Sequence, residues 1–304
     1  MWRSLILGVA HAAWFRRLAT RTAAGRALAG RFVAGETLVE ALAVARDVTV
    51  EGLRVMLNHL GENVDSPMAA LEAREAYLAE IAAAAAAPEI DAVVSIKPTQ
   101  LGLDDGVEAC WPNVDAILTE AAATGTALMI DMEDHRTVDG TLEIVRRANE
   151  RLPGTGVAIQ AYLRRSADDV FHLPPGCRVR IVKGAYLEPR ELVLGSKAAV
   201  DANFRRLFAT LLARGHPIDV ATHDPALLEG VRERVDELAD GWSRVEFQML
   251  YGVRRDLQRR YASKGYPVRV YIPYGTEWYP YLTRRLAERP ANLWFFLSNL
   301  VRTR

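Results

Sequence analysis

Short apolar segments alternate with helical segments along this chain of 304 residues, and that alternation limits the possible folds more than any other feature. Eight such apolar segments are typical of strands buried on both faces of a parallel sheet. They are residues 53–57, 92–96, 127–130, 156–159, 179–182, 218–221, 245–249 and 268–272. No GxGxxG loop follows the first of them, which disfavours a doubly wound nucleotide-binding sheet. Eight strand–helix repeats therefore predict an α/β protein, a distorted (β/α)8 barrel of the TIM type.

Helical periodicity fills the intervals between these expected strands. The expected helices are residues 67–86, 113–124, 138–151, 196–214, 225–239 and 254–264. Another helix is expected at 35–45, where Thr37 can cap it, so extra N-terminal helices occupy about residues 1–46. Pro273 and Gly275 are expected to stop the last strand, and a helix with an apolar stripe follows them. No linker interrupts the pattern, so we expect one domain over residues 1–304.

Charge and cysteine usage narrow the class of protein. The 38 basic and 38 acidic residues balance, which argues against a nucleic-acid partner. Cys110 and Cys177 are the only cysteines, so neither a disulfide framework nor a CxxC metal site is expected. This composition is typical of a protein of the reducing cytoplasm.

The N-terminal segment has an apolar stretch from Leu5 to Phe15 that is too short to span a bilayer and lacks a clear cleavage site. We expect a helix here. With Arg16 and Arg17 behind it, such a helix could touch a membrane surface, although packing on the domain is the favoured interpretation.

Polar side chains stand at or just beyond the ends of nearly all the expected strands. Barrel enzymes hold their chemistry where the carboxyl ends of the strands meet, and a purely structural barrel gains nothing from burying polar groups there. The sequence therefore predicts a functional site at this end. The residues concerned include Lys97, Asp131, Gln160, Arg180, Lys183, Tyr186, Thr222, His223, Gln248 and Tyr271.

Several of these residues also have a purely structural interpretation. Lys97 is either a rim lysine directed outward or a fixed positive charge in the site. Asp131 either caps the next helix or orients a cation such as Lys97. His223 is either structural or a base, a ligand or a donor to a cofactor. A metal site at Asp131, Glu133, Asp134 and His135 is disfavoured, because no second histidine stands at HxH or HExxH spacing.

The segment RIVKGAY from Arg180 suits a cofactor. Arg180 and Lys183 are interpreted as pointing to one side, and Gly184 lets the backbone approach a ligand closely. No GxSxG motif is present, and neither cysteine stands at a strand end beside a histidine. Without a nucleophile–base pair, cofactor chemistry such as that of a flavin dinucleotide is the natural hypothesis.

A second group of charges lies on the last expected helix. Arg284 and Arg285 are adjacent, and Glu288 lies one turn further on. Two guanidinium groups held by a carboxylate can grip a small carboxylate through paired hydrogen bonds. The alternative is a solvated helix face with i,i+4 support.

These motifs together resemble those of the monofunctional bacterial proline dehydrogenases, a family of FAD-dependent distorted (β/α)8 barrels. The resemblance runs through most of the chain. It rests on GETLVEAL at 35–42, LGE at 60–62, VSIKPTQLG from Val94, RIVKGAY from Arg180, ATH at 221–223, FQMLYG from Phe247, and YIPYG with YLTRRLAE near the end.

The resemblance implies oxidation of L-proline to Δ1-pyrroline-5-carboxylate, with hydride passing from C5 to flavin N5 and electrons reaching a membrane quinone. It also implies a location in the cytoplasm or peripherally at the inner face of the membrane. A separate pyrroline-5-carboxylate dehydrogenase would make the next step to glutamate, because this chain has no room for that domain.

The resemblance also implies roles for individual residues. Arg284, Arg285 and Lys97 would bind the proline carboxylate, Asp131 and Glu288 would hold those cations, and Glu62 would pair with Arg284 as a gate or cap a helix. Tyr271, Tyr281, Tyr186, Ala185 and Leu250 would form the wall around the ring. Arg180 would approach flavin N5, and Gln160, Val182, Lys183, Gly184, Ala185, Thr222, His223 and Gln248 would complete the FAD site.

Two alternatives remain open at this point. One is another flavin-dependent barrel, such as an enzyme like methylenetetrahydrofolate reductase, which would be reduced by a nicotinamide cofactor. The other is a non-catalytic barrel that binds an amino acid, which would be colourless when purified.

Overall fold

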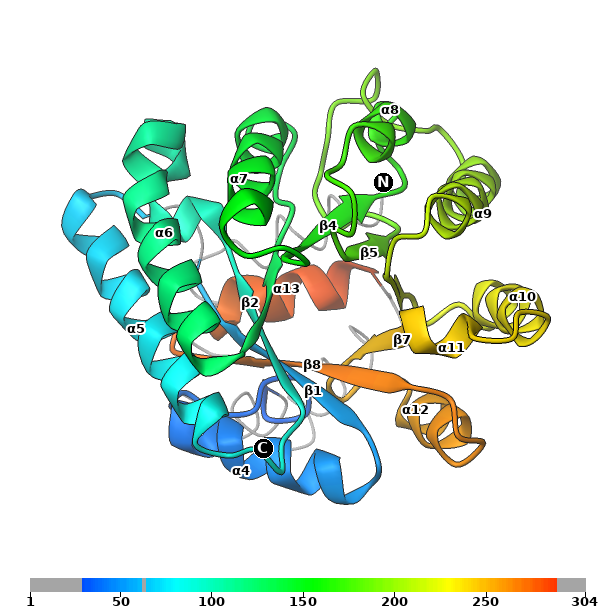
Figure 1. Ribbon diagram of the computed structural model, residues 1–304, viewed down its shortest axis with the longest axis horizontal. Coiled ribbons are helices and arrows are strands. Elements are labelled where there is room, and N and C mark those ends of the chain that lie inside the picture. Colours follow the sequence, from blue (N-terminus) through cyan, green and yellow to red (C-terminus); the bar gives the residue numbers. More distant parts are fainter. Residues whose placement is uncertain (1–28, 62–63, 289–304) are drawn as a thin grey trace, which may run out of the picture.

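The computed structural model describes residues 29–61 and 64–288, without the side chains of 284–288. Eight parallel strands form a closed barrel in sequence order, with β8 pairing to β1 (Figure 1). Their bounds match the predicted strands within two residues at each end. The strands are β1 (Arg54–His59), β2 (Ala92–Ile96), β3 (Ala127–Ile130), β4 (Gly156–Gln160), β5 (Val179–Val182), β6 (Ile218–Ala221), β7 (Val245–Leu250) and β8 (Val268–Tyr274).

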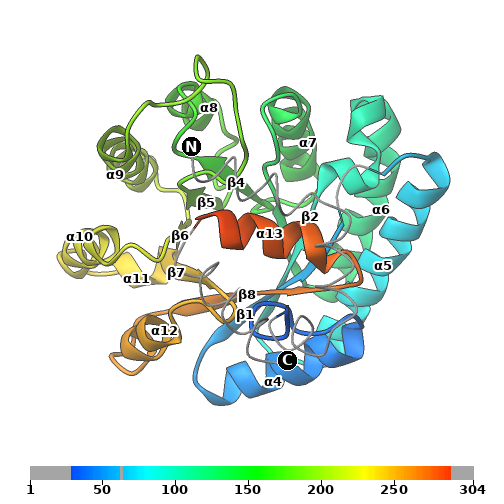
Figure 2. The same cartoon turned by 180° about the vertical axis from the view of Figure 1, so that it is seen from behind.

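Helices surround the barrel, and one helix crosses it. The surrounding helices are α4 (Leu38–Val50), α5 (Pro67–Ala85), α6 (Val107–Thr124), α7 (Val138–Arg151), α8 (Ser166–Phe171), α9 (Lys197–Ala213), α10 (Pro225–Asp236), α11 (Gly241–Arg244) and α12 (Arg255–Ala262). Two 3₁₀ turns, η1 (Pro98–Leu101) and η2 (Leu103–Asp105), precede α6. The last helix, α13 (Trp278–Glu288), runs across the barrel and is nearest the viewer in Figure 2.

Local capping residues explain where several helices begin. Thr37 and Glu40 form a reciprocal capping box at the start of α4. Ser66 caps α5 directly before Pro67, and Asp224 caps α10 directly before Pro225. Proline suits the first helical turn because the missing N–H would have no partner there.

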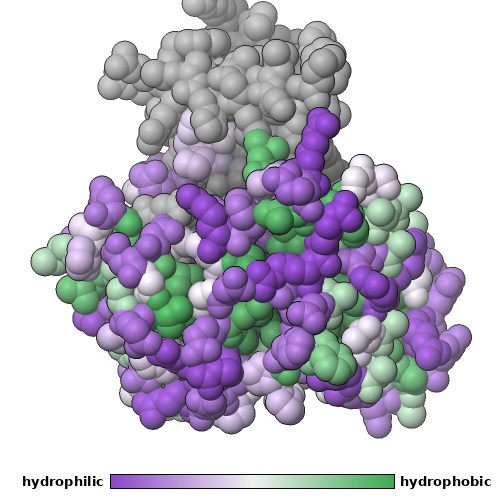
Figure 3. Space-filling model, turned by 90° about the horizontal axis from the view of Figure 1, so that it is seen from above, coloured by the Kyte–Doolittle hydropathy of each residue, from purple (hydrophilic) through white to green (hydrophobic). Residues whose placement is uncertain are grey.

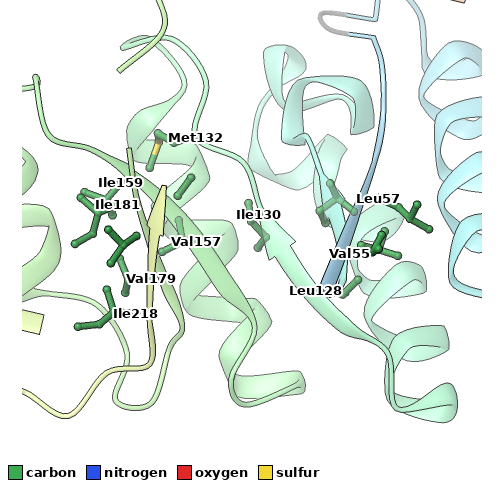
Figure 4. Packing of buried hydrophobic residues seen from close by; sticks show 14 of the residues in the cluster. Val55, Leu57, Leu128, Ile130, Met132, Val157, Ile159, Val179, Ile181 and Ile218 are labelled. Atoms are coloured by element: carbon green, nitrogen blue, oxygen red, sulfur yellow. The ribbon is translucent and has the colours of Figure 1, made fainter. Parts of the chain in front are cut away.

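Side chains alternate between the two faces of each strand, and this alternation separates the core from the site. Outward-facing residues such as Val55, Leu57, Leu128 and Ile130 pack beneath the helices (Figure 4). Inward-facing Met56, Val93 and Met129 fill the middle of the barrel. The outward core is continuous, and further members labelled in Figure 4 are Val157, Ile159, Val179, Ile181 and Ile218.

An ion network closes the amino-terminal end of the barrel. Arg269 is buried, and its Nε lies 2.7 Å from Glu246 Oε1. Arg178 pairs with the buried Asp219 at 2.7 Å. Burial and the neighbouring Glu246 raise the pKa of Asp219 to about 6. These groups lie away from the strand ends where the functional site was expected.

Four expectations about secondary structure were wrong in detail. The helix expected at residues 35–45 runs from Leu38 to Val50 as α4. Strand β8 continues through Pro273 to Tyr274, because Ala34 donates to the carbonyl of Pro273 and Leu60 donates to that of Tyr274. Helix α6 begins at Val107 rather than 113 and accommodates Pro112. The short helices α8 and α11 were not predicted, because segments of 6 and 4 residues are too short to show a helical period.

On the face shown in Figure 3, the described residues are mainly hydrophilic, with small hydrophobic patches between them. Among the residues that the structure describes, no helix combines the length and the apolar character needed to cross a bilayer.

Candidate active site

A cavity of about 760 Å³ opens at the carboxyl ends of the strands. Residues within each strand or directly after it line the cavity, and α13 adds Tyr281. All predicted site residues whose side chains the structure describes lie along it. They are Lys97, Asp131, Gln160, Arg180, Val182, Lys183, Gly184, Ala185, Tyr186, Thr222, His223, Gln248, Leu250, Tyr271 and Tyr281.

Four predicted residues lie outside this description. Glu62 falls in the gap at residues 62–63, and only the backbone of α13 is described at Arg284, Arg285 and Glu288. The predicted gate and the predicted carboxylate clamp therefore stay predictions.

Asp131 is the centre of a buried polar cluster at the floor of the cavity. Its Oδ2 lies 3.2 Å from Lys97 Nζ, and its Oδ1 accepts a hydrogen bond from Arg180. Ser95 Oγ donates to Oδ1 at 2.7 Å, and the hydroxyl of Tyr271 donates to Oδ2 at 3.0 Å. Asp131 therefore contacts two cations in the structure, as in the second of its two interpretations, and does not act as a helix cap.

Electrostatics keep this carboxylate ionised although it is buried. Burial by itself raises the pKa of Asp131, but the charges of Arg180 and Lys97, together with the hydrogen bond from Ser95, outweigh it and lower the pKa to about 2. Removing either cation would leave a buried charge without full compensation.

Arg180 is directed into the barrel between two elements of the site. Its guanidinium lies 5.4 Å from the ring centroid of Tyr271, and one of its terminal nitrogens lies 3.0 Å from the sulfur of Met56. Its Nε is buried and has no hydrogen-bond partner among the described residues. A buried donor of this kind costs free energy unless a ligand accepts its hydrogen bond.

Two members of this cluster were missed at the sequence level. Asn58 accepts a hydrogen bond from Lys97 Nζ, and Ser95 donates to Asp131. Both are buried. The period of two along a strand could have indicated them, because Asn58 shares a face with the inward Met56, and Ser95 shares one with Lys97.

A second buried layer supports Lys97 from behind. Its backbone N–H donates to the hydroxyl of Tyr77 at 3.1 Å, and Tyr77 donates in turn to Gln100. Glu80, on the same helix as Tyr77, is fully buried. Burial raises the pKa of Glu80 to about 8, although the charge of Lys97 partly opposes this. Glu80 is therefore protonated and neutral at pH 7.

Lys183 differs from the sequence interpretation, in which it shared a side with Arg180. Its Nζ lies 2.6 Å from Asp201 and 2.8 Å from Asp224, so it faces the starts of α9 and α10. Lys197 joins both aspartates in an alternating square of charges. The reason is the strand period, because residues three apart point to opposite faces. Lys183 still lines the cavity, but at its wall rather than at its floor.

His223 is fixed in orientation by the backbone. The N–H of Leu250 donates to His223 Nε2 at 3.0 Å, so in the neutral ring the hydrogen is on Nδ1. Nearby, Gln248 donates to Glu246, and its Oε1 is a buried acceptor with no partner among residues 29–61 and 64–288.

The acidic residues after β3 diverge instead of converging on one point. Glu133 accepts hydrogen bonds from Thr99, whereas Asp134 pairs with Arg136. His135 contacts Glu188. Within the described part of the chain, no group of three or more histidine, cysteine or carboxylate side chains is arranged to hold a metal ion.

The cavity thus combines a cationic floor with an aromatic and aliphatic wall. Lys97 and Arg180 supply the positive charge, while Tyr271, Tyr281 and Leu250 supply ring and aliphatic surface. Such a site suits a small molecule with a carboxylate and an apolar body. Arg180 Nε and Gln248 Oε1, which have no partners among the described residues, could bond to a second ligand group that is polar and planar.

Comparison with known proteins gives a consistent result. The chain matches the sequence profile named proline dehydrogenase over residues 41–297. It is 40% identical over 283 residues to a proline dehydrogenase of Deinococcus radiodurans, with 90% of each chain covered. It is 34% identical over 303 residues to proline dehydrogenase 2 of Bacillus subtilis strain 168, with 99% of each chain covered.

A solved structure shares the fold. The match is to proline utilization A from Bdellovibrio bacteriovorus inactivated by N-propargylglycine, with a TM-score of 0.79 and 26% identity. The match covers 86% of this chain and 32% of that longer chain.

Proposed function

This chain belongs to the proline dehydrogenase family, and from that premise we propose that it is an FAD-dependent enzyme that oxidises L-proline to Δ1-pyrroline-5-carboxylate. The reaction is the first step in the degradation of proline to glutamate. The observation that supports this most directly is the meeting of Lys97, Asp131, Arg180 and Tyr271 at the floor of one cavity.

The residues of the cavity fit a flavin. Arg180 Nε is a buried donor and Gln248 Oε1 a buried acceptor, each without a partner among the described residues. An isoalloxazine ring offers carbonyl acceptors and a ring N–H donor on one molecule, so it can satisfy both. The residues that would hold FAD are Gln160, Arg180, Val182, Lys183, Gly184, Ala185, Thr222, His223 and Gln248.

When bound, FAD would supply at N5 the acceptor for the hydride that leaves C5 of proline, while the amine nitrogen loses its proton to water. The protein supplies charge and orientation. Lys97, held by Asp131 and Asn58, offers a fixed positive charge for the proline carboxylate. The proposed clamp of Arg284 and Arg285, held by Glu288, would grip the same carboxylate from α13, and Glu62 would pair with Arg284 as a gate.

The wall residues serve the apolar part of the substrate. Tyr271, Tyr281, Tyr186, Ala185 and Leu250 line the cavity and would enclose the pyrrolidine ring. Excluding water there strengthens the cationic interactions, because charges attract more strongly in a less polar medium. Tyr271 also spans the two regions, since its hydroxyl donates to Asp131 while its ring faces Arg180.

The electron acceptor and the location follow from the same proposal. We propose a membrane quinone as the final acceptor, and a cytoplasmic protein that reaches it peripherally at the inner face of the membrane. A separate pyrroline-5-carboxylate dehydrogenase would take the product onward.

The visible spectrum recorded anaerobically before and after addition of L-proline tests the proposal. A flavin spectrum that bleaches with proline is the expected result. A yellow protein that stays oxidised would point to another substrate, as in the alternative of a different flavin-dependent barrel. A colourless protein that FAD does not reconstitute would overturn the proposal and favour an amino-acid-binding barrel.

A further inference from the structure

The loop that joins β5 to α9, residues 183–196, carries two residues of the proposed substrate wall. Ala185 and Tyr186 line the cavity. Backbone hydrogen bonds hold both ends of this loop to one neighbouring segment. Tyr162 donates to the carbonyl of Lys183 at 2.9 Å near the start, and Leu194 donates to the carbonyl of Tyr162 at 2.8 Å near the end.

One side chain ties the middle of the loop to the rest of the barrel. The side chain of Glu188 is only 1% exposed although its loop runs over the surface. Its Oε1 accepts a hydrogen bond from the backbone N–H of His135 at 3.0 Å, and its Oε2 contacts His135 Nδ1. The hydroxyl of Tyr162 lies 3.4 Å from Oε1. Glu188 therefore joins the loop after β5 to the loops after β3 and β4.

The neighbouring residues make this contact distinctive. Leu187 directly before Glu188 is 62% exposed, and Glu191 three residues later is also exposed. A carboxylate that is buried between exposed neighbours makes a specific structural contact and is not a solvated surface ion pair. Exposed ion pairs contribute little, whereas a buried carboxylate needs its hydrogen-bond donors in place.

The contact reaches the cavity wall through Tyr162. The hydroxyl of Tyr162 lies 3.4 Å from the carbonyl oxygen of Tyr186 as well as from Glu188. Its ring lies against Gly184, where φ is +126° and an added Cβ would collide with the ring. The segment from Gly184 to Glu188 thus rests on one tyrosine and on His135, and Tyr186 lies in the middle of that segment.

We propose that Glu188 is a positioning residue that holds the Ala185–Tyr186 wall at its place in the cavity, through His135 and Tyr162, and so sets the affinity for proline. This inference rests on the proposed function for its substrate, but the contact itself does not depend on it. Glu188 lies two residues beyond Tyr186, so release of its side chain frees the wall without removing any group that lines the cavity.

Hydrogen exchange of the substrate-free protein tests the contact without any activity measurement. We expect the amide of His135, which donates to Glu188, and the amide of Ala185, which donates to Gln160, to exchange at least about tenfold faster in Glu188→Ala than in the wild type. Glu191→Ala, a matched change on the same loop, leaves exchange unchanged. Equal protection in Glu188→Ala and the wild type would overturn the proposal.

Steady-state kinetics test the consequence for the substrate. We expect Glu188→Ala to raise KM for proline about 5- to 20-fold while kcat changes by less than about threefold. Glu188→Gln keeps an acceptor for the His135 N–H and stays within about threefold of the wild-type KM. An unchanged KM in Glu188→Ala, or a loss confined to kcat, would overturn the assignment.

Two further results keep the tests separable. If Glu188→Ala does not fold, the variants His135→Ala and Tyr162→Phe replace it. Each should raise KM for proline at least about twofold. An unchanged KM in both variants would overturn the proposal. If the wild type does not oxidise proline but Glu188→Ala still speeds exchange, the contact stands and the proposed function fails.

Discussion

Asp131 Oδ2 lies 3.2 Å from Lys97 Nζ while Asp131 Oδ1 accepts a hydrogen bond from Arg180. One buried carboxylate thus fixes two cations, one directly after β2 and the other within β5. The arrangement holds both positive charges in place before substrate arrives, so little reorganisation is needed when the substrate carboxylate binds.

Replacing Asp131 by Asn should harm both activity and stability. The substitution leaves Lys97 and Arg180 buried without their carboxylate, so we expect kcat/KM for proline to fall at least about 100-fold and unfolding free energy to fall by roughly 3 kcal/mol. Proline-dependent dye reduction and urea denaturation measure the two effects. Asp105→Asn, at an exposed position, is the control and should leave both unchanged. Wild-type turnover in Asp131→Asn would remove Asp131 from the site.

Glu80 should make the unfolding free energy fall as the pH rises from 4.5 to about 8. Its pKa is about 8 in the folded protein, against an ordinary value of 4.5, so the stabilising contribution is present below pH 4.5 and is lost as pH rises through 8. Glu80→Gln lacks this titration. We therefore expect the difference in unfolding free energy between Glu80→Gln and the wild type to shift in favour of the mutant. The shift should be up to about 1.4 kcal/mol per pH unit between pH 5 and 8.

Urea denaturation at a series of pH values measures that difference. Glu72→Gln, an exposed change on the same helix, should show a constant offset from the wild type. A constant offset for Glu80→Gln as well would mean that Glu80 does not titrate with folding.

Arg269 should matter for stability but not for the chemistry. Besides Glu246, it donates to the backbone carbonyls of Val55 and Asp91 at the amino-terminal end of the barrel. Arg269→Met leaves the buried Glu246 without its buried cation, with only the partly exposed Arg54 and the amide of Gln248 beside it. We therefore expect the unfolding free energy to fall by about 3 kcal/mol, with KM for proline unchanged in the folded enzyme.

Thermal and urea unfolding provide the measurement for Arg269→Met. The control is Arg259→Met, which breaks a surface pair with Glu51 and should cost no more than about 1 kcal/mol. If Arg269→Met lost as little unfolding free energy as Arg259→Met, the buried network would not stabilise the barrel.

Arg284 is the sharpest test of the proposed clamp. Its removal takes away one fork of hydrogen-bond donors for the proline carboxylate, so Arg284→Ala should raise KM and lower kcat together, with kcat/KM reduced roughly 100- to 1000-fold. The surface variant Arg151→Ala, which loses only a pair with Asp115, is the control. Near-normal kinetics for Arg284→Ala would rule out the clamp.

Local sequence pattern determined the fold of this protein to a large extent. Apolar runs of 4 or 5 residues separated by helical periods indicated eight buried strands. Eight strand–helix repeats are typical of a closed barrel, which is the arrangement found. The strand ends then identified the cavity residues, because the carboxyl ends of parallel strands necessarily meet on one side. The alternation of side chains along a strand also places Asn58 and Ser95 on the inward face. They were missed because the polar residues within the strands were not considered.

Tertiary structure alone decided which of these residues are partners. Asp131 could have capped a helix or paired with any of several cations, and only closure of the barrel brings it against Lys97 and Arg180. Likewise, His135 and Glu188 are 53 residues apart and meet only because the loops after β3 and β5 end on the same rim. Periodicity determines the face on which a side chain lies, because it depends on the local backbone. The choice of partner, and the pKa that follows from it, depends on which distant segments burial brings together.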